Sequence, residues 1–130
     1  MDVPPAVIIH GIEDARAALA PSLPLTLLSA PGAALYAGCG FWRALVRQAR
    51  AEFPGVRAPD ILDCADATGY ALSALRLGLR MLVVVPDAPG RDAVAAVAAA
   101  AGAVLLAAPP PALDLADPAA ARRLAAWLRG

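Results

Sequence analysis

Two aspartates that flank a cysteine, Asp63 and Asp66, form the sharpest chemical signal in this chain. Asp63 lies within or at the end of an otherwise apolar run, Ile61–Cys64, where a lone carboxylate is costly unless it is hydrogen-bonded or charge-paired. Asp66 stands where a helical pattern begins, and aspartate is a preferred N-cap. Two such carboxylates could bind a divalent ion, or one could hold a ribose or another hydroxyl group. In the structural alternative, Asp63 accepts loop N–H groups and Asp66 caps the helix.

The single histidine, His10, ends another apolar run, Ala6–His10. A general base would be well placed there, although a hydrogen bond to a loop carbonyl is the more ordinary role. Ser29 ends the run Leu25–Ser29 and is followed by Ala-Pro-Gly, whereas a nucleophile elbow needs Gly-x-Ser-x-Gly. The sequence therefore does not indicate that His10 and Ser29 belong to a catalytic triad.

The loop from Ser29 to Gly40 is the best candidate for an anion cradle. Its three glycines let backbone N–H groups approach a ligand, and a helix that begins near the loop's end offers free donors. These glycines are Gly32, Gly38 and Gly40. The Gly38-Cys39-Gly40 segment is not a dinucleotide fingerprint, because Arg43 stands where a third glycine is needed, and a structural kink is the alternative. Cys39 at a helix N-terminus could be an activated thiol, but one histidine in the chain argues against a cysteine hydrolase.

All eleven basic residues are arginines, and this excludes several kinds of chemistry. Schiff-base catalysis and a Walker A phosphate loop both require lysine. A phosphoacceptor receiver domain would carry a lysine after its last strand, where this chain has Pro109–Pro111. A helical stripe of arginines could touch phosphate or an acidic partner, but a solvated helix face is the expected role at zero net charge. The stripe consists of Arg43, Arg47 and Arg50.

Five short apolar runs, each followed by a helical pattern, must position these residues. The runs are continuous and not alternating, which is typical of strands buried on both faces of a parallel sheet. They are Ala6–His10, Leu25–Ser29, Ile61–Cys64, Met81–Val85 and Ala103–Ala107. We therefore expect one domain over residues 1–130, an α/β fold. It would be a three-layer α/β/α sandwich with a five-stranded, mostly parallel sheet. The strand order would be 3-2-1-4-5 (Rossmann-like) or the flavodoxin-like 2-1-3-4-5.

The helical patterns carry their own expectations. A helix up to about Glu52 should bury Trp42 and expose Arg43 and Arg47. Glycines should end two helices immediately before strands, at Gly78 and Gly102. The Ala- and Val-rich helix from about Arg91 to Ala101 should be buried on more than one side. The prolines Pro109–Pro111 should form a stiff spacer, and Asp117 and Pro118 should start the last helix.

Composition limits the classes of protein to which the chain can belong. Eleven basic and eleven acidic residues give zero net charge, so no general nucleic-acid partner is expected. No apolar run reaches the ~18–20 residues of a membrane span, and the first residues lack the positive region of a signal peptide. Two cysteines outside any CxxC pair should be reduced and partly buried. These features predict a cytoplasmic protein with no membrane partner.

In open parallel sheets, ligands bind outside the carboxyl ends of the strands, which we call the rim. We therefore expect a small-ligand-binding domain whose ligand is anionic or hydroxylated. The candidate ligand-binding residues are His10, Ser29, Gly32, Gly38, Cys39, Gly40, Asp63, Asp66 and Asp87. The alternative is a non-catalytic module for self-assembly or protein interaction, and surplus apolar helix surface predicts a homodimer. The sequence indicates no metal site or particular cofactor, and it leaves open whether the protein is an enzyme.

Overall fold

Strands and helices alternate along most of the chain, as the apolar runs predict. The computed structural model describes residues 3–130, and these residues contain six strands and six helices. They divide into two compact units. The first comprises residues 3–30, Ala44–Asp60 and Pro110–Gly130, and the second comprises Pro31–Arg43 and Ile61–Pro109.

The first unit is built around a central strand with a parallel neighbour on each edge. Its strands are β1 (Ala6–Ile8), β2 (Thr26–Leu28) and β6 (Ala112–Asp114). Strand β1 pairs with both others, and Ala6 is in register with Thr26 on one side and Ala112 on the other. The unit's helices are α1 (Ile12–Leu19), residues 44–52 of α3 (Cys39–Glu52) and α6 (Ala120–Arg129). Helix α6 packs against β6.

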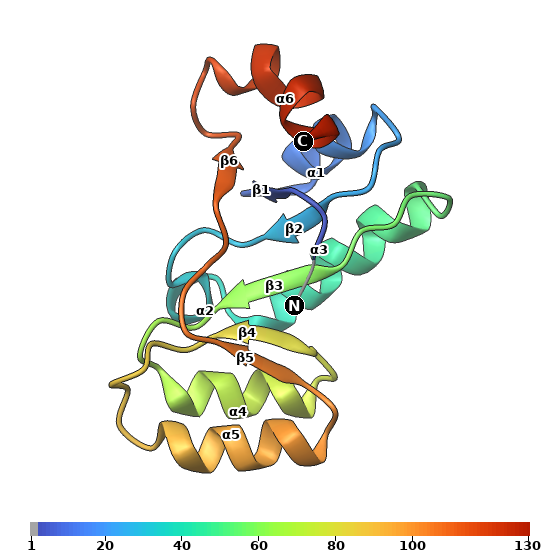
Figure 1. The fold of residues 1–130 in the computed structure, drawn as a ribbon. Helices are drawn as coiled ribbons and strands as arrows, with labels where there is room; N and C mark the ends of the chain where they lie inside the picture. Colours follow the sequence, from blue (N-terminus) through green and yellow to red (C-terminus); the bar gives the residue numbers. More distant parts are fainter. Residues whose placement is uncertain (1–2) are drawn as a thin grey trace. The chain divides into compact units, whose positions relative to one another are not determined.

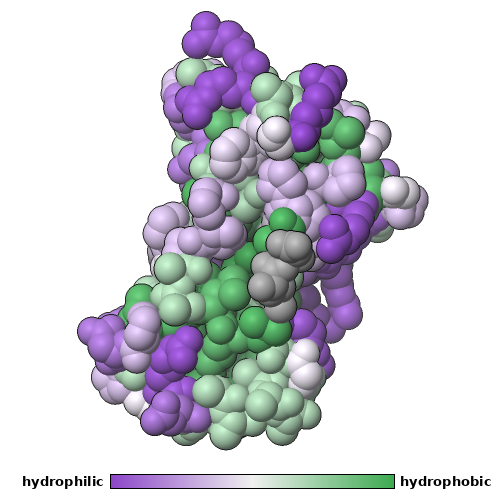
Figure 2. Space-filling model, in the orientation of Figure 1, coloured by the Kyte–Doolittle hydropathy of each residue, from purple (hydrophilic) through white to green (hydrophobic). Residues whose placement is uncertain are grey.

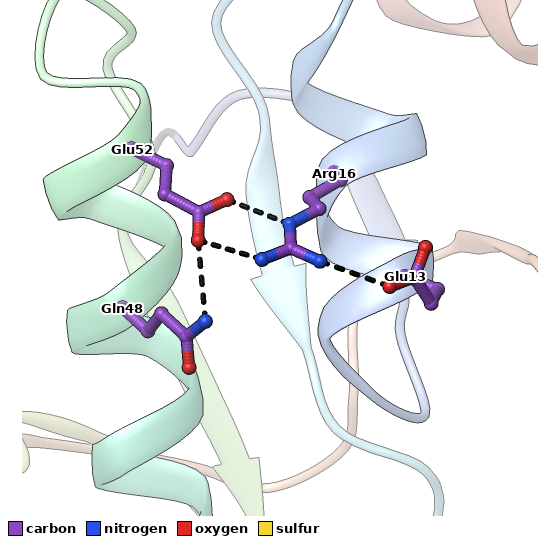
Figure 3. Close-up of polar contacts among 4 residues, drawn as sticks. All are labelled: Glu13, Arg16, Gln48 and Glu52. Carbon is purple, nitrogen blue, oxygen red and sulfur yellow. Dashed lines mark hydrogen bonds and ion pairs between the residues drawn. The ribbon is translucent and has the colours of Figure 1, made fainter.

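A polar network joins α1 to the end of α3 within this unit (Figure 3). The Arg16 guanidinium donates two hydrogen bonds to the Glu52 carboxylate, with Nε–Oε1 at 2.7 Å and Nη2–Oε2 at 2.9 Å. It donates a third to Glu13, and Gln48 donates to Glu52 over 3.2 Å. These bonds, from Arg16 above all, lower the pKa of Glu52 to about 2. The carboxylate is therefore ionised at neutral pH and ties the two helices together.

The second unit repeats the same plan with a different central strand. Its strands are β3 (Asp60–Asp63, of which residues 61–63 belong to this unit), β4 (Met81–Val83) and β5 (Val104–Leu106). Strand β4 pairs in parallel with both neighbours. The helices are α2 (Ala33–Tyr36), α4 (Thr68–Arg76) and α5 (Arg91–Ala100). Helices α4 and α5 pack side by side, and α5 packs against β5 (Figure 1). The predicted glycine exits are confirmed, with positive φ at Gly78 (+91°) and Gly102 (+71°).

The predicted α/β class, a parallel sheet flanked by helices, is confirmed, but residues 3–130 contain six strands and not five. Both predicted strand orders are wrong. The order 3-2-1-4-5 separates β3 from β4, which are paired, and the order 2-1-3-4-5 places β3 beside β1, whose two edges are taken by β2 and β6. The apolar character of a strand shows that it is buried and does not identify its neighbours. The sixth strand, β6, directly follows Pro109–Pro111 and is not among the five predicted strands.

Of the other local predictions, one is largely confirmed and one is wrong. Trp42 is 3% exposed, whereas Arg47 is exposed and Arg43 half-buried, so the predicted faces of α3 are largely right. Helix α5, in contrast, buries only Val94 and Ala98, so burial on more than one side is wrong. Alanine surface is only weakly apolar, and water is tolerated on it. None of the helices between residues 3 and 130 has both the length and the apolar character needed to cross a bilayer.

Helix starts differ from the sequence prediction in two places. Helix α4 begins at Thr68 with Ala67 as its N-cap, so Asp66 does not cap it. The Asp66 side chain is exposed, and the backbone carbonyl oxygen of Asp66 accepts the Thr68 N–H. Helix α6 begins at Ala120, two residues after Pro118. The Asp117 carboxylate accepts the Ala119 N–H, so this aspartate closes the turn before the helix.

Candidate functional site

A histidine–aspartate pair stands at the rim of the first unit. His10 follows β1 and Asp114 ends β6, the neighbouring parallel strand. The Nε2 atom of His10 lies 2.7 Å from Oδ1 of Asp114. The two side chains are 38% and 43% exposed, so the pair is formed and also open to solvent. Residues 104 positions apart in sequence thus meet because β1 and β6 end at the same edge.

Backbone contacts fix both members of the pair. The His10 N–H donates to Oδ2 of Asp14 in the first turn of α1, over 2.8 Å. Oδ1 of Asp114 also accepts the Ala116 N–H over 2.9 Å, and the Leu115 N–H continues the strand contact to Ile8. A carboxylate at a helix N-terminus is favoured by the helix dipole, so Asp14 is stabilised where it holds His10. The ring and the carboxylate are therefore positioned before any ligand arrives.

The protonation state of the pair follows from its hydrogen bonds. Burial by itself would raise the pKa of Asp114, but the bond with His10, the Ala116 N–H and the His10 charge together lower this pKa below its ordinary value. An ionised carboxylate can only accept, so Nε2 of His10 carries a proton. In the neutral ring, Nδ1 is then left as a proton acceptor. The pair can hydrogen-bond a ligand hydroxyl, and a protonated ring would offer an anion one N–H donor, at Nδ1.

The second unit places Asp63 in a structural role. Asp63 is buried, and its Oδ1 accepts the Ala65 N–H over 2.9 Å. Ala65 has a φ of +51°, which is uncommon for a residue with a Cβ. The Ala65 carbonyl accepts the Val85 N–H. Asp63 therefore holds a strained turn against the loop after β4, in agreement with the structural alternative for this residue.

Two further loops of this unit lie near that turn. A Cβ placed on Gly32 would stand 3.9 Å from the Ala65 Cβ, and Gly32 itself has a φ of +65°. The Thr68 hydroxyl donates to the Pro89 carbonyl over 3.0 Å. Beside Pro89, a polar hollow of about 200 Å³ is lined by six residues of the loop and of α5. They are Pro86, Asp87, Ala88, Gly90, Arg91 and Asp92. Of the predicted site residues, this hollow takes only Asp87.

The remaining predicted residues have local structural roles. Ser29 is buried in the first unit, and its hydroxyl donates to the Ala30 carbonyl. Gly38 has a φ of +85° and accepts the Trp42 N–H, while Cys39 and Gly40 open α3. Ser29 and Asp63 belong to different units, so a pocket shared by them stays a prediction.

Both cysteines are free, as predicted. Cys39 is half-buried and Cys64 is fully buried. Burial, with the nearby Asp63 charge and Cys39, raises the pKa of the Cys64 thiol to about 12. The Cys64 thiol is therefore protonated and unreactive at neutral pH.

The arginine stripe has one member with a structural task. Arg50 donates from Nε to the Ala58 carbonyl over 2.9 Å and closes the turn after α3. Arg47 is exposed, as a solvated face requires. Among residues 3–130, no group of three or more His, Cys, Asp or Glu side chains is placed to hold a metal ion. No known family model matches the chain, and no curated protein matches its sequence.

Sequence reasoning found His10 but missed its partners, Asp14 and Asp114. The sequence analysis assigns no element to the segment between the Pro109–Pro111 spacer and Asp117, where Asp114 lies. A signal was present, because Leu113 and Leu115 alternate with Asp114, and such alternation is typical of a short strand with one exposed face. Only the pairing of that strand with β1 brings Asp114 to the only histidine of the chain.

Proposed function

We propose that this chain is a small-ligand-binding α/β domain whose ligand is hydroxylated or anionic and binds at the rim of the first unit. The observation that carries the proposal is the exposed His10–Asp114 pair at the carboxyl ends of β1 and β6. Ligands of open parallel sheets bind at this edge. The free cysteines and the composition are consistent with a cytoplasmic location, which we propose as well.

The chemistry of the pair defines what it can recognise. A carboxylate that already accepts two hydrogen bonds has lone pairs left for a ligand hydroxyl. The imidazole adds a second acceptor when neutral and an N–H donor at Nδ1 when protonated. Polyols, sugar phosphates and small hydroxy acids combine these groups, so they are the compounds to test first.

A thermal-shift screen of such compounds tests the proposal, followed by NMR of the ring. A ligand at about one hundred times its Kd stabilises the native state by about 2.7 kcal/mol. For a chain of 130 residues, this corresponds to a rise in Tm of about 10 °C. Because His10 is the only histidine, its ring signals are unambiguous, and a bound ligand should shift them saturably.

Asp117 supplies a matched control for Asp114. Both aspartates accept the N–H two residues ahead, at 2.9 Å in each case, but only Asp114 also contacts His10. Asp114→Asn and His10→Ala should abolish the ligand-induced shift, whereas Asp117→Asn should keep it. The proposal fails if no hydroxylated or anionic compound gives a shift, or if the shift survives both rim substitutions.

A second candidate function, self-association, is favoured by a different observation. The large apolar side chains that are exposed in the structure all belong to the second unit, and Tyr36 is 69% exposed. They are Leu35, Tyr36, Phe41, Tyr70 and Val97. Figure 2 shows broad hydrophobic surface in the lower part of the molecule, where α4 and α5 lie in Figure 1. Exposed apolar surface of this kind is typical of interaction sites.

Light scattering coupled to size exclusion tests this candidate. A homodimer would show about twice the chain mass of 13.1 kDa. Tyr36→Ser should return it to the mass of one chain, while Arg47→Ser, an exposed polar position on α3, should leave the dimer intact. A mass near 13.1 kDa for the unmodified chain across a wide concentration range would reject the dimer.

A further inference from the structure

A second concave surface of the first unit lies at the end of β1 and β6 opposite the His10–Asp114 pair. It is a hollow of about 380 Å³. Its lining includes Ala6, the first residue of β1, and Pro111, which directly precedes β6. The other lining residues are Val3, Pro4, Pro5, Pro110, Ala126, Trp127 and Gly130. The volume falls within the ~300–1,000 Å³ of ordinary small-molecule pockets.

The lining of this hollow is poor in hydrogen-bond donors. Proline has no backbone N–H, so four of the wall residues supply none. The one side chain with a strong donor is Trp127, and its indole N–H already donates to the Ala6 carbonyl over 2.7 Å. A phosphate or carboxylate would therefore lose its hydration in the hollow without gaining donors in return.

Three backbone carbonyls of the same lining are also engaged. The Pro4 carbonyl accepts the Thr26 hydroxyl over 2.7 Å, and the Pro5 carbonyl accepts the Thr26 N–H over 2.9 Å. With the Ala6 carbonyl bonded to Trp127, three successive carbonyls have donors from the protein itself. The Trp127 ring and the four proline rings of the lining offer a ligand flat apolar surfaces.

We propose that this hollow, bordered by Trp127 and the two proline pairs, is a binding site for an uncharged planar aromatic molecule. The site is independent of the rim, because it uses the opposite ends of the same two strands. Its recognition differs as well: the rim offers a charge and polar acceptors, whereas this hollow offers apolar area.

Two-dimensional NMR of the ¹⁵N-labelled chain, with indole as the probe, tests the site. The chain has two tryptophans, and Trp42 is 3% exposed, so its indole signal serves as the internal reference. Indole should shift the Trp127 Nε1–H signal saturably and leave Trp42 unchanged. Indole-3-acetate, which adds a carboxylate to the same ring system, should bind at least tenfold more weakly.

Two substitutions on α6 distinguish binding of indole in the hollow from nonspecific binding of indole to exposed apolar surface. Ala126 is exposed and lines the hollow, whereas Ala125 is exposed and does not line it. Ala126→Phe should fill the space and weaken indole at least tenfold, and Ala125→Phe should leave its affinity unchanged. Ala126→Met provides a smaller filling variant if the phenylalanine disturbs the fold.

Three results would overturn the proposal. The first is a Trp127 signal that does not respond saturably to indole, and the second is equal affinity in the Ala126 and Ala125 variants. The third is a fall in solution mass on Ala126→Phe, measured by light scattering, because a second copy of the chain would then be the occupant of the hollow.

Discussion

The turn at Ala65 makes a quantitative prediction, because this residue has a left-handed backbone conformation that alanine disfavours. Its φ is +51°, and the buried Asp63 carboxylate holds it there through the Ala65 N–H. Replacing Ala65 by glycine removes the Cβ and leaves that hydrogen bond in place. We therefore expect Ala65→Gly to stabilise the protein, although glycine ordinarily destabilises it.

The magnitude follows from two opposing terms. An L-residue with a Cβ loses about 1–2 kcal/mol in the left-handed region, and the glycine substitution recovers this. Glycine also raises the conformational entropy of the unfolded chain, which costs about 0.4–1 kcal/mol. The net effect lies between zero and about 1.5 kcal/mol of stabilisation. For 130 residues this is a rise in Tm of up to about 6 °C.

The contribution of Asp63 to stability can be measured with alanine and with glycine at position 65. Asp63→Ala removes a buried, charge-assisted hydrogen bond and should cost at least about 1.5–3 kcal/mol with alanine at position 65. With glycine at position 65 the turn is not strained, so Asp63→Ala should lower the free energy of unfolding by about 1 kcal/mol less. Urea unfolding of the four proteins gives this coupling energy directly.

The control is the same substitution at a position with ordinary helical geometry. Ala96 is exposed on α5, and Ala96→Gly should cost about 1 kcal/mol. If Ala65→Gly destabilises the protein as much as Ala96→Gly does, the turn stores no strain. If the cost of Asp63→Ala is the same in both backgrounds, Asp63 does not act through Ala65. Either result refutes the reasoning.

Two further predictions concern acid stability and helix termination. The pKa of Glu52 is lowered to about 2 from an ordinary 4.5, so its contribution to stability is complete above about pH 4.5 and is lost as the pH falls toward 2. Glu52→Gln should therefore lower stability at pH 7 and reduce its pH dependence between 4.5 and 2 in urea unfolding; equal curves for both proteins would contradict this. Gly78→Ala forces a φ of +91° on alanine and should cost about 1 kcal/mol, whereas Gly69→Ala within α4 should stabilise by a similar amount in a thermal melt. The same sign for both glycines would show that backbone conformation is not the cause.

Local features of this protein were predictable from its sequence because their causes are local. Gly78 and Gly102 end helices with positive φ because only glycine adopts that conformation without strain. The burial of Trp42 follows from its spacing along one helix. The same kind of reasoning identified the wrong N-cap for α4. This helix begins at Thr68, so its N-cap is Ala67 and not Asp66.

The candidate site was only half predictable. His10 was identified because a polar residue follows an apolar run, and such residues gather at the rim. Its partner Asp114 was not, because β6 has three residues and too little pattern to identify it alone. Strand β6 is defined by its pairing with β1, more than a hundred residues away in sequence.

The sequence by itself determined five of the strands, the alternation of strands and helices over most of the chain and the buried face of α3, since hydrophobic periodicity and backbone preferences act within a few residues. The tertiary structure alone decided which strands are neighbours, which is why the fold has β1 between β2 and β6 and not beside β3 or β4. Any apolar strand can pair with any other, so the choice depends on how the whole chain packs. That choice joined His10 to Asp114 and brought Trp127 to the backbone of Ala6.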